Sequence, residues 1–297
     1  MTFATLPTQT TGADAGTQID ELRRQLTGEL FTPSSPGYDD ARQVQDITND
    51  ARPLAIVRAE GEADVIAAVR LARATGAPLA VRSGGHSLAR YSMVDGALVV
   101  DLSRMKGIEI DPATRTARVQ TGVTSGDLAG PAAEHGLAIS TGDTSSVGFG
   151  GLTTGGGIGF MVRKYGLTID NLLSARVVTA DGEIVTVSET ERPELFWAIR
   201  GGGGNFGIVT ELELQLAPVP QILGGDLLLP ATRETVRGYL EYSASAPDDL
   251  TTIGNIMSAG PVRAAGVGRQ AGAVDHRDLV GRCRGGAAGA RAAAGAG

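Results

Sequence analysis

Apolar and polar residues follow a regular order between residues 54 and 82, and this order predicts a strand, a helix and a second strand. Residues 54–57 form a short apolar run that is typical of a buried strand. In residues 63–74 the apolar side chains recur at helical spacing on one side: Val65, Ile66, Val69 and Ala72. Residues 79–82 form the next predicted strand, which leads directly into two glycines and a histidine.

Shorter elements continue the pattern up to residue 216. We predict strands at residues 98–100, 107–110 and 116–120. Ser125 can cap a helix that ends near His135. Residues 177–187 predict a hairpin that turns at Asp181 and Gly182, and residues 208–216 alternate as a strand does. This mixture of elements predicts an α+β domain.

The chain divides into four segments. Residues 1–49 are an N-terminal extension: residues 1–20 are rich in Thr, Ala and Gly and are expected to be disordered, and residues 19–30 predict a helix. Residues 50–219 hold the α+β pattern, which ends at a proline-rich step. Residues 220–258 begin a second unit, with a predicted strand at 227–229 and a predicted helix at 233–243.

The fourth segment, residues 259–297, is a tail of low complexity. It contains 12 Ala, 10 Gly and 6 Arg, with no aromatic residue and no usable period, so we expect it to be disordered. Six Arg against two Asp also make it basic. We therefore expect that the tail is out of frame with an ancestral coding sequence, or follows a truncation, and that most of the second unit is missing. A naturally disordered basic tail is the alternative.

Composition is that of a soluble enzyme domain, with 42% hydrophobic residues. The net charge of −7 argues against nucleic acid or an anionic membrane as a partner. The N-terminal residues lack a secretory pattern and no run of 18 apolar residues occurs, so the expected location is the cytoplasm. Cys283 is the only cysteine and the histidines lack ligand spacing, so we expect no disulfide and no metal.

Three glycine clusters carry the candidate chemistry: residues 84–86, 148–159 and 201–207. In the first, Gly84 and Gly85 allow a flat ligand to approach the backbone, and His86 offers a nucleophilic ring nitrogen. Successive backbone N–H groups in such runs form anion sites, and the hydroxyls of Thr153 and Thr154 are donors suited to a pyrophosphate. Taken singly, each run could be an ordinary loop or linker.

Other nucleotide sites and a hydrolase are excluded by context. Gly202, Gly204 and Gly207 match G-x-G-x-x-G, but a predicted strand follows them where a Rossmann site needs a helix. The chain has no P-loop pattern and no G-x-S-x-G elbow. His135 is interpreted as the end of a helix, because a histidine complements the dipole there.

The residues from about 53 to about 220 resemble the berberine bridge enzyme-like flavoproteins, which belong to the vanillyl-alcohol oxidase class of FAD-linked oxidases with a PCMH-type FAD-binding domain. The matching motifs are Gly84-Gly85-His86, Asp101-Leu102-Ser103, the run from Gly148 to Gly159, Arg163-Lys164-Tyr165-Gly166-Leu167 with Asp170-Asn171, the hairpin at Asp181-Gly182, and Leu195 to Arg200 followed by Gly201 to Gly207. Six ordered motifs make chance convergence very unusual.

The resemblance implies a fold of two α/β subdomains with FAD at their junction, followed by the start of an incomplete antiparallel-sheet substrate domain. It implies that His86 is bonded to the 8α-methyl of the flavin. Some relatives carry a second tether on a cysteine, but Thr144 stands at that position. The further expected cofactor contacts are Arg82, Ser83, Gly84, Gly85, Ser87, Gly142, Thr144, Gly150, Gly151, Thr154, Gly156, Asn205, Gly207 and Val209.

The implied function is an FAD-dependent oxidase that takes a hydride from a carbon of a small-molecule substrate, such as an alcohol, a sugar or a secondary metabolite, with O₂ as the acceptor. In the family the catalytic base lies on the substrate domain, and no residue here is a candidate for it. Tyr165 and Asn171 are interpreted as packing residues. Two alternatives stay open: a non-catalytic remnant, and a nicotinamide-dependent reductase resembling UDP-N-acetylenolpyruvoylglucosamine reductase.

Overall fold

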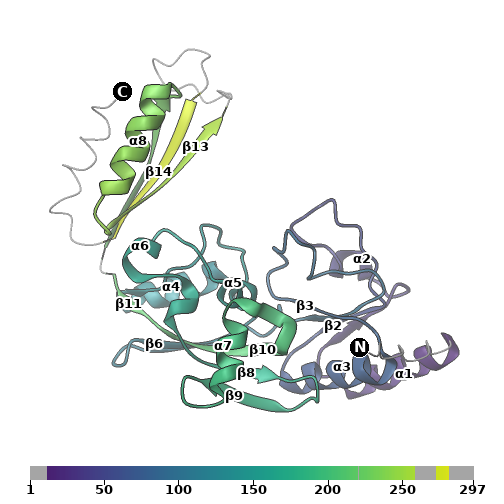
Figure 1. The fold of residues 1–297 in the computed structure, drawn as a ribbon. Coiled ribbons are helices and arrows are strands. Elements are labelled where there is room, and N and C mark those ends of the chain that lie inside the picture. Colours follow the sequence, from purple (N-terminus) through teal and green to yellow (C-terminus); the bar gives the residue numbers. More distant parts are fainter. Residues whose placement is uncertain (1–11, 220, 258–271, 281–297) are drawn as a thin grey trace, which may run out of the picture.

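The structure is a computed structural model that describes residues 12–219, 221–257 and 272–280. Figure 1 shows two sheets with their helices side by side, and a smaller sheet that projects beyond them. We call the part built on the first two sheets the main domain, and the part after residue 220 the second unit. Helices and strands mix throughout, which confirms the predicted α+β class.

The first subdomain is built on a four-stranded sheet in the order β1-β2-β4-β3. β2 (Ala55–Arg58), β4 (Leu98–Asp101) and β3 (Leu79–Arg82) run parallel, and β1 (Glu29–Phe31) is antiparallel to β2. Parallel strands need a crossover, and α3 (Glu62–Thr75) supplies it between β2 and β3. Every residue of β4 is buried, because this strand lies between two others.

The N-terminal helix corrects two expectations. α1 (Gly12–Gln25) occupies residues expected to be disordered, and it ends before the predicted residue 30. It packs against α3, and Leu22 is buried in the core between them. The helix stops because the carboxylate of Asp64 accepts hydrogen bonds from the backbone N–H groups of Thr27 (2.8 Å) and Gly28 (3.0 Å). The chain then enters β1.

The second subdomain is an antiparallel five-stranded sheet in the order β5-β6-β10-β8-β9. Its strands are β5 (Ile108–Asp111), β6 (Thr116–Gln120), β8 (Leu172–Val178), β9 (Ile184–Ser188) and β10 (Ile208–Gln215). Its core contains Phe149, Phe196, Ile199, Leu212 and Leu214, with less than 3% of each exposed. The predicted hairpin is confirmed, because β8 and β9 pair with Val178 opposite Ile184.

Three longer helices belong to this subdomain: α4 (Ser125–Glu134), α5 (Phe149–Gly155) and α7 (Pro193–Gly202). The N-cap of α4 is Thr124, one residue before the predicted cap. Thr124 and Asp127 form a capping box, in which each side chain accepts a hydrogen bond from the backbone N–H of the other. His135 follows as the C-cap, as predicted. The short elements are α2 (Tyr38–Ala41), β7 (Leu137–Ala138), α6 (Val162–Tyr165), η1 (Thr168–Asn171), η2 (Gly203–Phe206) and β11 (Ala217–Pro218).

The two subdomains pack directly against each other. Val178 and Ile208, from the second sheet, belong to the core of the first subdomain. Beside them, Glu62 at the start of α3 accepts hydrogen bonds from Arg176 Nε (3.0 Å) and from Thr210 Oγ1 (2.7 Å). The bond from Arg176 lowers the pKa of Glu62, although partial burial opposes this. The contact between the two subdomains therefore combines apolar packing with an ion pair between Arg176 and Glu62.

The second unit is a three-stranded antiparallel sheet with one helix. Its elements are β12 (Ile222–Pro230), α8 (Arg233–Ser245), β13 (Leu250–Met257) and β14 (Gly272–Val280), and the sheet order is β12-β14-β13. The strand predicted at 227–229 lies inside β12, and the helix predicted at 233–243 is α8. β14 corrects the expectation that the whole tail lacks regular structure. A central strand gains backbone hydrogen bonds on both edges, which requires no apolar period. The other tail residues lie outside the described residues.

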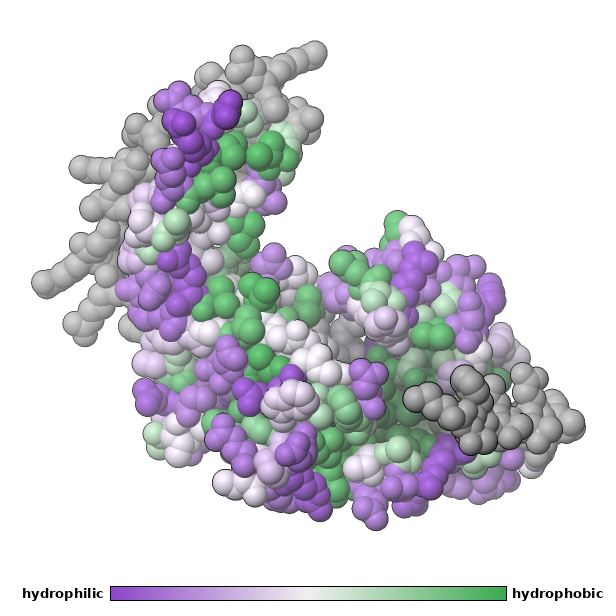
Figure 2. All heavy atoms as spheres, in the orientation of Figure 1, coloured by the Kyte–Doolittle hydropathy of each residue, from purple (hydrophilic) through white to green (hydrophobic). Residues whose placement is uncertain are grey.

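Figure 2 shows a hollow in the surface between the second unit and the loops of the first subdomain near α2. None of the helices in the described part of the chain combines the length and the hydropathy that crossing a membrane requires.

Candidate functional site

The loop after β3, residues 83–87, is the centre of the candidate site. Five successive backbone N–H groups, of Ser83, Gly84, Gly85, His86 and Ser87, donate no hydrogen bond to any described residue. Gly85 has a φ of +73° and is buried, so this turn needs glycine. Free N–H groups in a tight turn form a concave site with a positive potential. The loop is therefore suited to bind a phosphate.

A second loop, residues 141–148, packs directly against the first. A Cβ added to Gly84 would lie 2.3 Å from Gly148 N, and a Cβ added to Gly148 would lie 2.1 Å from Ser83 Oγ. Backbone contact this close is possible only for glycine at both positions. It brings the ring nitrogen Nε2 of His86 to 2.9 Å from Ser146 Oγ. Sequence reasoning missed Ser146, because its partner lies 60 residues away.

Thr121 is a further residue that the sequence did not single out. Its backbone oxygen accepts a hydrogen bond from Ser83 Oγ, and its own hydroxyl donates to Val209 O at 2.7 Å. A Cβ on Gly150 would lie 2.9 Å from Thr121 Cβ. Three expected site residues from distant segments, Ser83, Gly150 and Val209, therefore meet around one buried threonine.

The second glycine cluster divides into packed and open positions. Gly157 and Gly159 are packed, since an added Cβ would lie 2.1 Å from Thr168 Oγ1 and 1.3 Å from Thr141 O. Gly151 and Gly156 face open space, with nothing within 4 Å, and Gly142 has only Leu152 near it, at 3.6 Å. Thr154 uses its hydroxyl within its own helix, donating to Gly150 O at 2.8 Å. The open glycines leave room for a ligand beside the backbone.

The third cluster lies beside α5, which packs against α7, η2 and β10. Asn205 is exposed, and its side-chain amide donates to Gly202 O at 2.7 Å. Gly207 has a φ of +146°, and a Cβ there would lie 2.6 Å from Val177 Cγ1. The structure thus brings the three glycine clusters into one region. Asn205 and Gly207, however, already have local structural roles.

Arg82 supports the site from behind. Its guanidinium donates to Ala41 O (2.6 Å) and Gln43 O (2.9 Å) and forms a short ion pair with Asp101, which is fully buried. Burial raises the pKa of Asp101, but the hydrogen bond and charge of Arg82 and the bond from Arg58 hold this pKa below its ordinary value. The side chain expected to contact the cofactor is thus engaged in the scaffold beneath the loop.

Thr144 and Asn171 form local hydrogen bonds. Thr144 is exposed, and its hydroxyl donates to Asp143 Oδ1 at 3.0 Å. Asn171 donates to the backbone oxygens of Tyr165 (3.0 Å) and Leu167 (2.8 Å), which supports its interpretation as a packing residue. Among the described residues, no group of three or more His, Cys, Asp and Glu could hold a metal ion.

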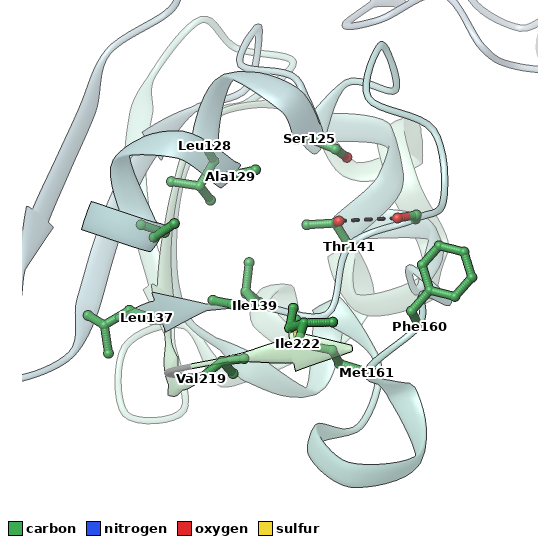
Figure 3. A pocket seen from close by; sticks show the side chains of 14 residues that line it. Ser125, Leu128, Ala129, Leu137, Ile139, Thr141, Phe160, Met161, Val219 and Ile222 are labelled. Carbon is green, nitrogen blue, oxygen red and sulfur yellow. Dashed lines mark hydrogen bonds between the residues drawn. The ribbon is translucent and has the colours of Figure 1, made fainter. Parts of the chain in front are cut away.

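A cavity of about 350 Å³ opens next to this region, under α4. Figure 3 shows Leu128 and Ala129 of α4 on one side and Ile139, Val219 and Met161 across from them. Its wall is mostly apolar, with Ser125 and Thr141 as polar exceptions, and Gly142 is the only expected site residue that lines it. No sequence pattern indicates this cavity, because its wall comes from four separate segments.

The donor groups fit FAD better than a smaller ligand. The loop 83–87 offers N–H groups for a diphosphate, the open glycines leave space along a flat ring, and His86 stands at the rim with Nδ1 bonded to no described residue. The described residues of both loops carry no acidic side chain except Asp143, so a diphosphate meets little repulsion.

Comparisons with known proteins agree with this geometry. Residues 53–188 match the family described as FAD binding domain. (R)-6-hydroxynicotine oxidase of Paenarthrobacter nicotinovorans is 46% identical over 234 residues, which are 79% of this chain and 48% of that protein. The chain spans about half the length of the curated relatives it matches.

Solved structures show the same likeness. The crystal structure of 6-hydroxy-D-nicotine oxidase from Arthrobacter nicotinovorans has a TM-score of 0.84 and 36% identity, over 92% of this chain and 60% of that one. A variant of BBE-like 1 from Physcomitrella patens has a TM-score of 0.85 and 25% identity, over 94% of this chain and 60% of that one. The chain therefore carries an FAD binding domain and is similar to FAD-linked oxidoreductases, berberine bridge enzyme-like proteins among them, and FAD is its cofactor.

Proposed function

We propose that this chain holds FAD covalently through His86 and forms the cofactor-binding part of an oxidase that acts on a small molecule. The observation that carries the proposal is the loop 83–87, where five free N–H groups end at a histidine that faces a second, glycine-held loop. When bound, FAD supplies a ring that accepts a hydride from a substrate carbon and passes the electrons to O₂.

Different segments of the site would bind different parts of FAD. Residues 83–87 would hold the diphosphate through their backbone N–H groups. The open backbone at Gly151 and Gly156 would lie along the cofactor, since an added Cβ meets nothing there. Gly142 and Thr144 lie on the second loop, which also carries Ser146. Asn205, Gly207 and Val209 would border the site from the third cluster.

His86 has the arrangement that a covalent tether requires. Its Nε2 is engaged by Ser146 at 2.9 Å, which leaves Nδ1 as the nitrogen available to form a bond. An imidazole is nucleophilic only when neutral, so the tether forms only while His86 is unprotonated. Attachment of FAD would replace one C–H bond of the flavin 8α-methyl and one N–H bond of the imidazole by a C–N bond. The two electrons and two protons released would pass to O₂, which would give hydrogen peroxide.

The substrate class rests on the relatives. A curated relative named above is an oxidase of hydroxynicotine, which supports a small organic molecule as the substrate. In this chain the second unit is the place from which a side chain could reach such a substrate, because it borders the hollow in Figure 2. We propose O₂ as the final electron acceptor.

The test uses the full chain produced with riboflavin and then precipitated with acid. We expect the pellet to stay yellow and the peptide containing His86 to gain the mass of FAD. His86→Ala should give a colourless pellet, while the folded variant still binds FAD reversibly. An unmodified His86 peptide from folded, FAD-saturated protein would refute the tether. Flavin that is released by acid and reduced by NADPH would point to a reductase instead.

A further inference from the structure

The segment 163–165 reaches out of the main domain and contacts the second unit. Arg163 donates through Nη1 to Ser243 O (2.8 Å) and through Nη2 to Ala246 O (2.6 Å). Ser243 is in the last turn of α8, and Ala246 is its C-cap. The last carbonyl groups of a helix have no partner within the helix and carry the negative end of its dipole. A guanidinium from another part of the chain therefore satisfies the end of α8.

The next two residues contact other parts of the same unit. Lys164 forms an ion pair with Asp249, in the turn between α8 and β13. Tyr165 donates its hydroxyl to Pro218 O at 3.3 Å, in the connection between the main domain and the second unit. Arg163 Nη2 also lies 3.8 Å from Asp248. Three consecutive residues thus contact the helix end, the following turn and the connecting strand.

Hydrogen bonds within the main domain hold the backbone around residues 163–165 in place. Asn171 donates to Tyr165 O and Leu167 O, and the carboxylate of Asp170 accepts the N–H of Leu167 at 2.9 Å. Gly166, with a φ of +75°, makes the turn between α6 and η1. In addition, α6 of the main domain packs against β13 of the second unit.

We propose that Arg163, Lys164 and Tyr165 form a clamp that sets the position of the second unit on the FAD-binding domain. Arg163 is the principal positioning residue, because one planar guanidinium spans two carbonyl groups. Its side chain is only 31% exposed, so water screens these bonds less than most surface contacts. Because the second unit borders the hollow seen in Figure 2, the clamp sets how far that hollow is open.

The experiment uses the full chain and measures hydrogen exchange of backbone amides by mass spectrometry. Arg163→Ala should speed exchange by about tenfold in peptides covering 217–222 and 243–250, which corresponds to a loss of about 1.4 kcal/mol in the opening equilibrium. Peptides covering 55–82 and 98–121 should exchange as in the parent protein. Arg163→Lys should give an intermediate result, since an ammonium reaches one carbonyl better than two.

Arg237→Ala is the matched control. Arg237 is on α8 as well, but it is 72% exposed and pairs only weakly with Glu241, at 3.7 Å. Its removal should leave every peptide unchanged. Exchange in 217–222 and 243–250 that is the same in Arg163→Ala as in the parent would overturn the proposal. So would faster exchange throughout the main domain, because Arg163 would then support the fold itself. Neither outcome depends on the flavin tether.

Discussion

Asp101→Asn should destabilise the main domain more than any other single change of charge that we consider. The variant keeps the size of the side chain, so no cavity forms. It removes the negative charge that faces the guanidinium of Arg82, whose side chain is 10% exposed, and the Nε of Arg58 at 3.0 Å. Breaking a buried ion pair on one side leaves an uncompensated charge and costs about 3–5 kcal/mol.

The pH dependence gives a second, independent measurement. The pKa of Asp101 is lower in the folded protein than in the unfolded chain, where an aspartate has a pKa of about 3.9. Its contribution to stability is therefore complete above about pH 4 and is lost as the pH falls through the lower, folded value. The difference in unfolding free energy between the parent protein and Asp101→Asn should be largest at pH 7 and shrink below pH 4.

The assay is urea unfolding followed by circular dichroism at pH 7 and at pH 3. Asp39→Asn is the control, because Asp39 also pairs with an arginine, Arg42 at 2.7 Å, but is 72% exposed. Its unfolding midpoint should match that of the parent. A cost below about 1 kcal/mol for Asp101→Asn at pH 7, or an equal cost at pH 3, would refute the reasoning about the buried charge.

Three further changes test the site and its frame. In the His86→Ala variant, which binds FAD reversibly, Gly148→Ala should weaken FAD binding by about tenfold or more in a fluorescence titration, because its Cβ would lie 2.1 Å from Ser83 Oγ and must displace the loop; unchanged affinity would contradict the close packing. Ser146→Ala should slow the covalent attachment of FAD, which is measured as flavin fluorescence of the denatured protein band. The control variant Ser145→Ala should attach FAD at the parent rate. Equal rates in the two variants would exclude Ser146 as the residue that orients His86. Gly16→Ala should raise the free energy of unfolding by about 0.5–1 kcal/mol, since Gly16 is inside α1 with nothing within 4 Å; a lower midpoint in urea would argue against that helix.

Local sequence pattern was enough to predict most elements of the main domain. The strands at 79–82, 116–120 and 208–215 follow apolar runs or alternation, and these depend on neighbouring residues alone. The loop 83–87 was also predictable, because two glycines and a histidine after a buried strand have few other uses. The family motifs then indicated FAD before any tertiary contact was known.

Only the tertiary structure decided which groups meet. The helix at 12–25 forms because α3 offers it an apolar surface, although its own residues suggest disorder. Arg82 looked like a cofactor contact, but its partners Asp101, Ala41 and Gln43 lie 19 to 41 residues away. The same holds for Ser146, Thr121 and the contacts of Arg163. Spacing along the chain records local hydrogen bonding and periodicity, whereas a contact between distant segments depends on how both pack on a shared core.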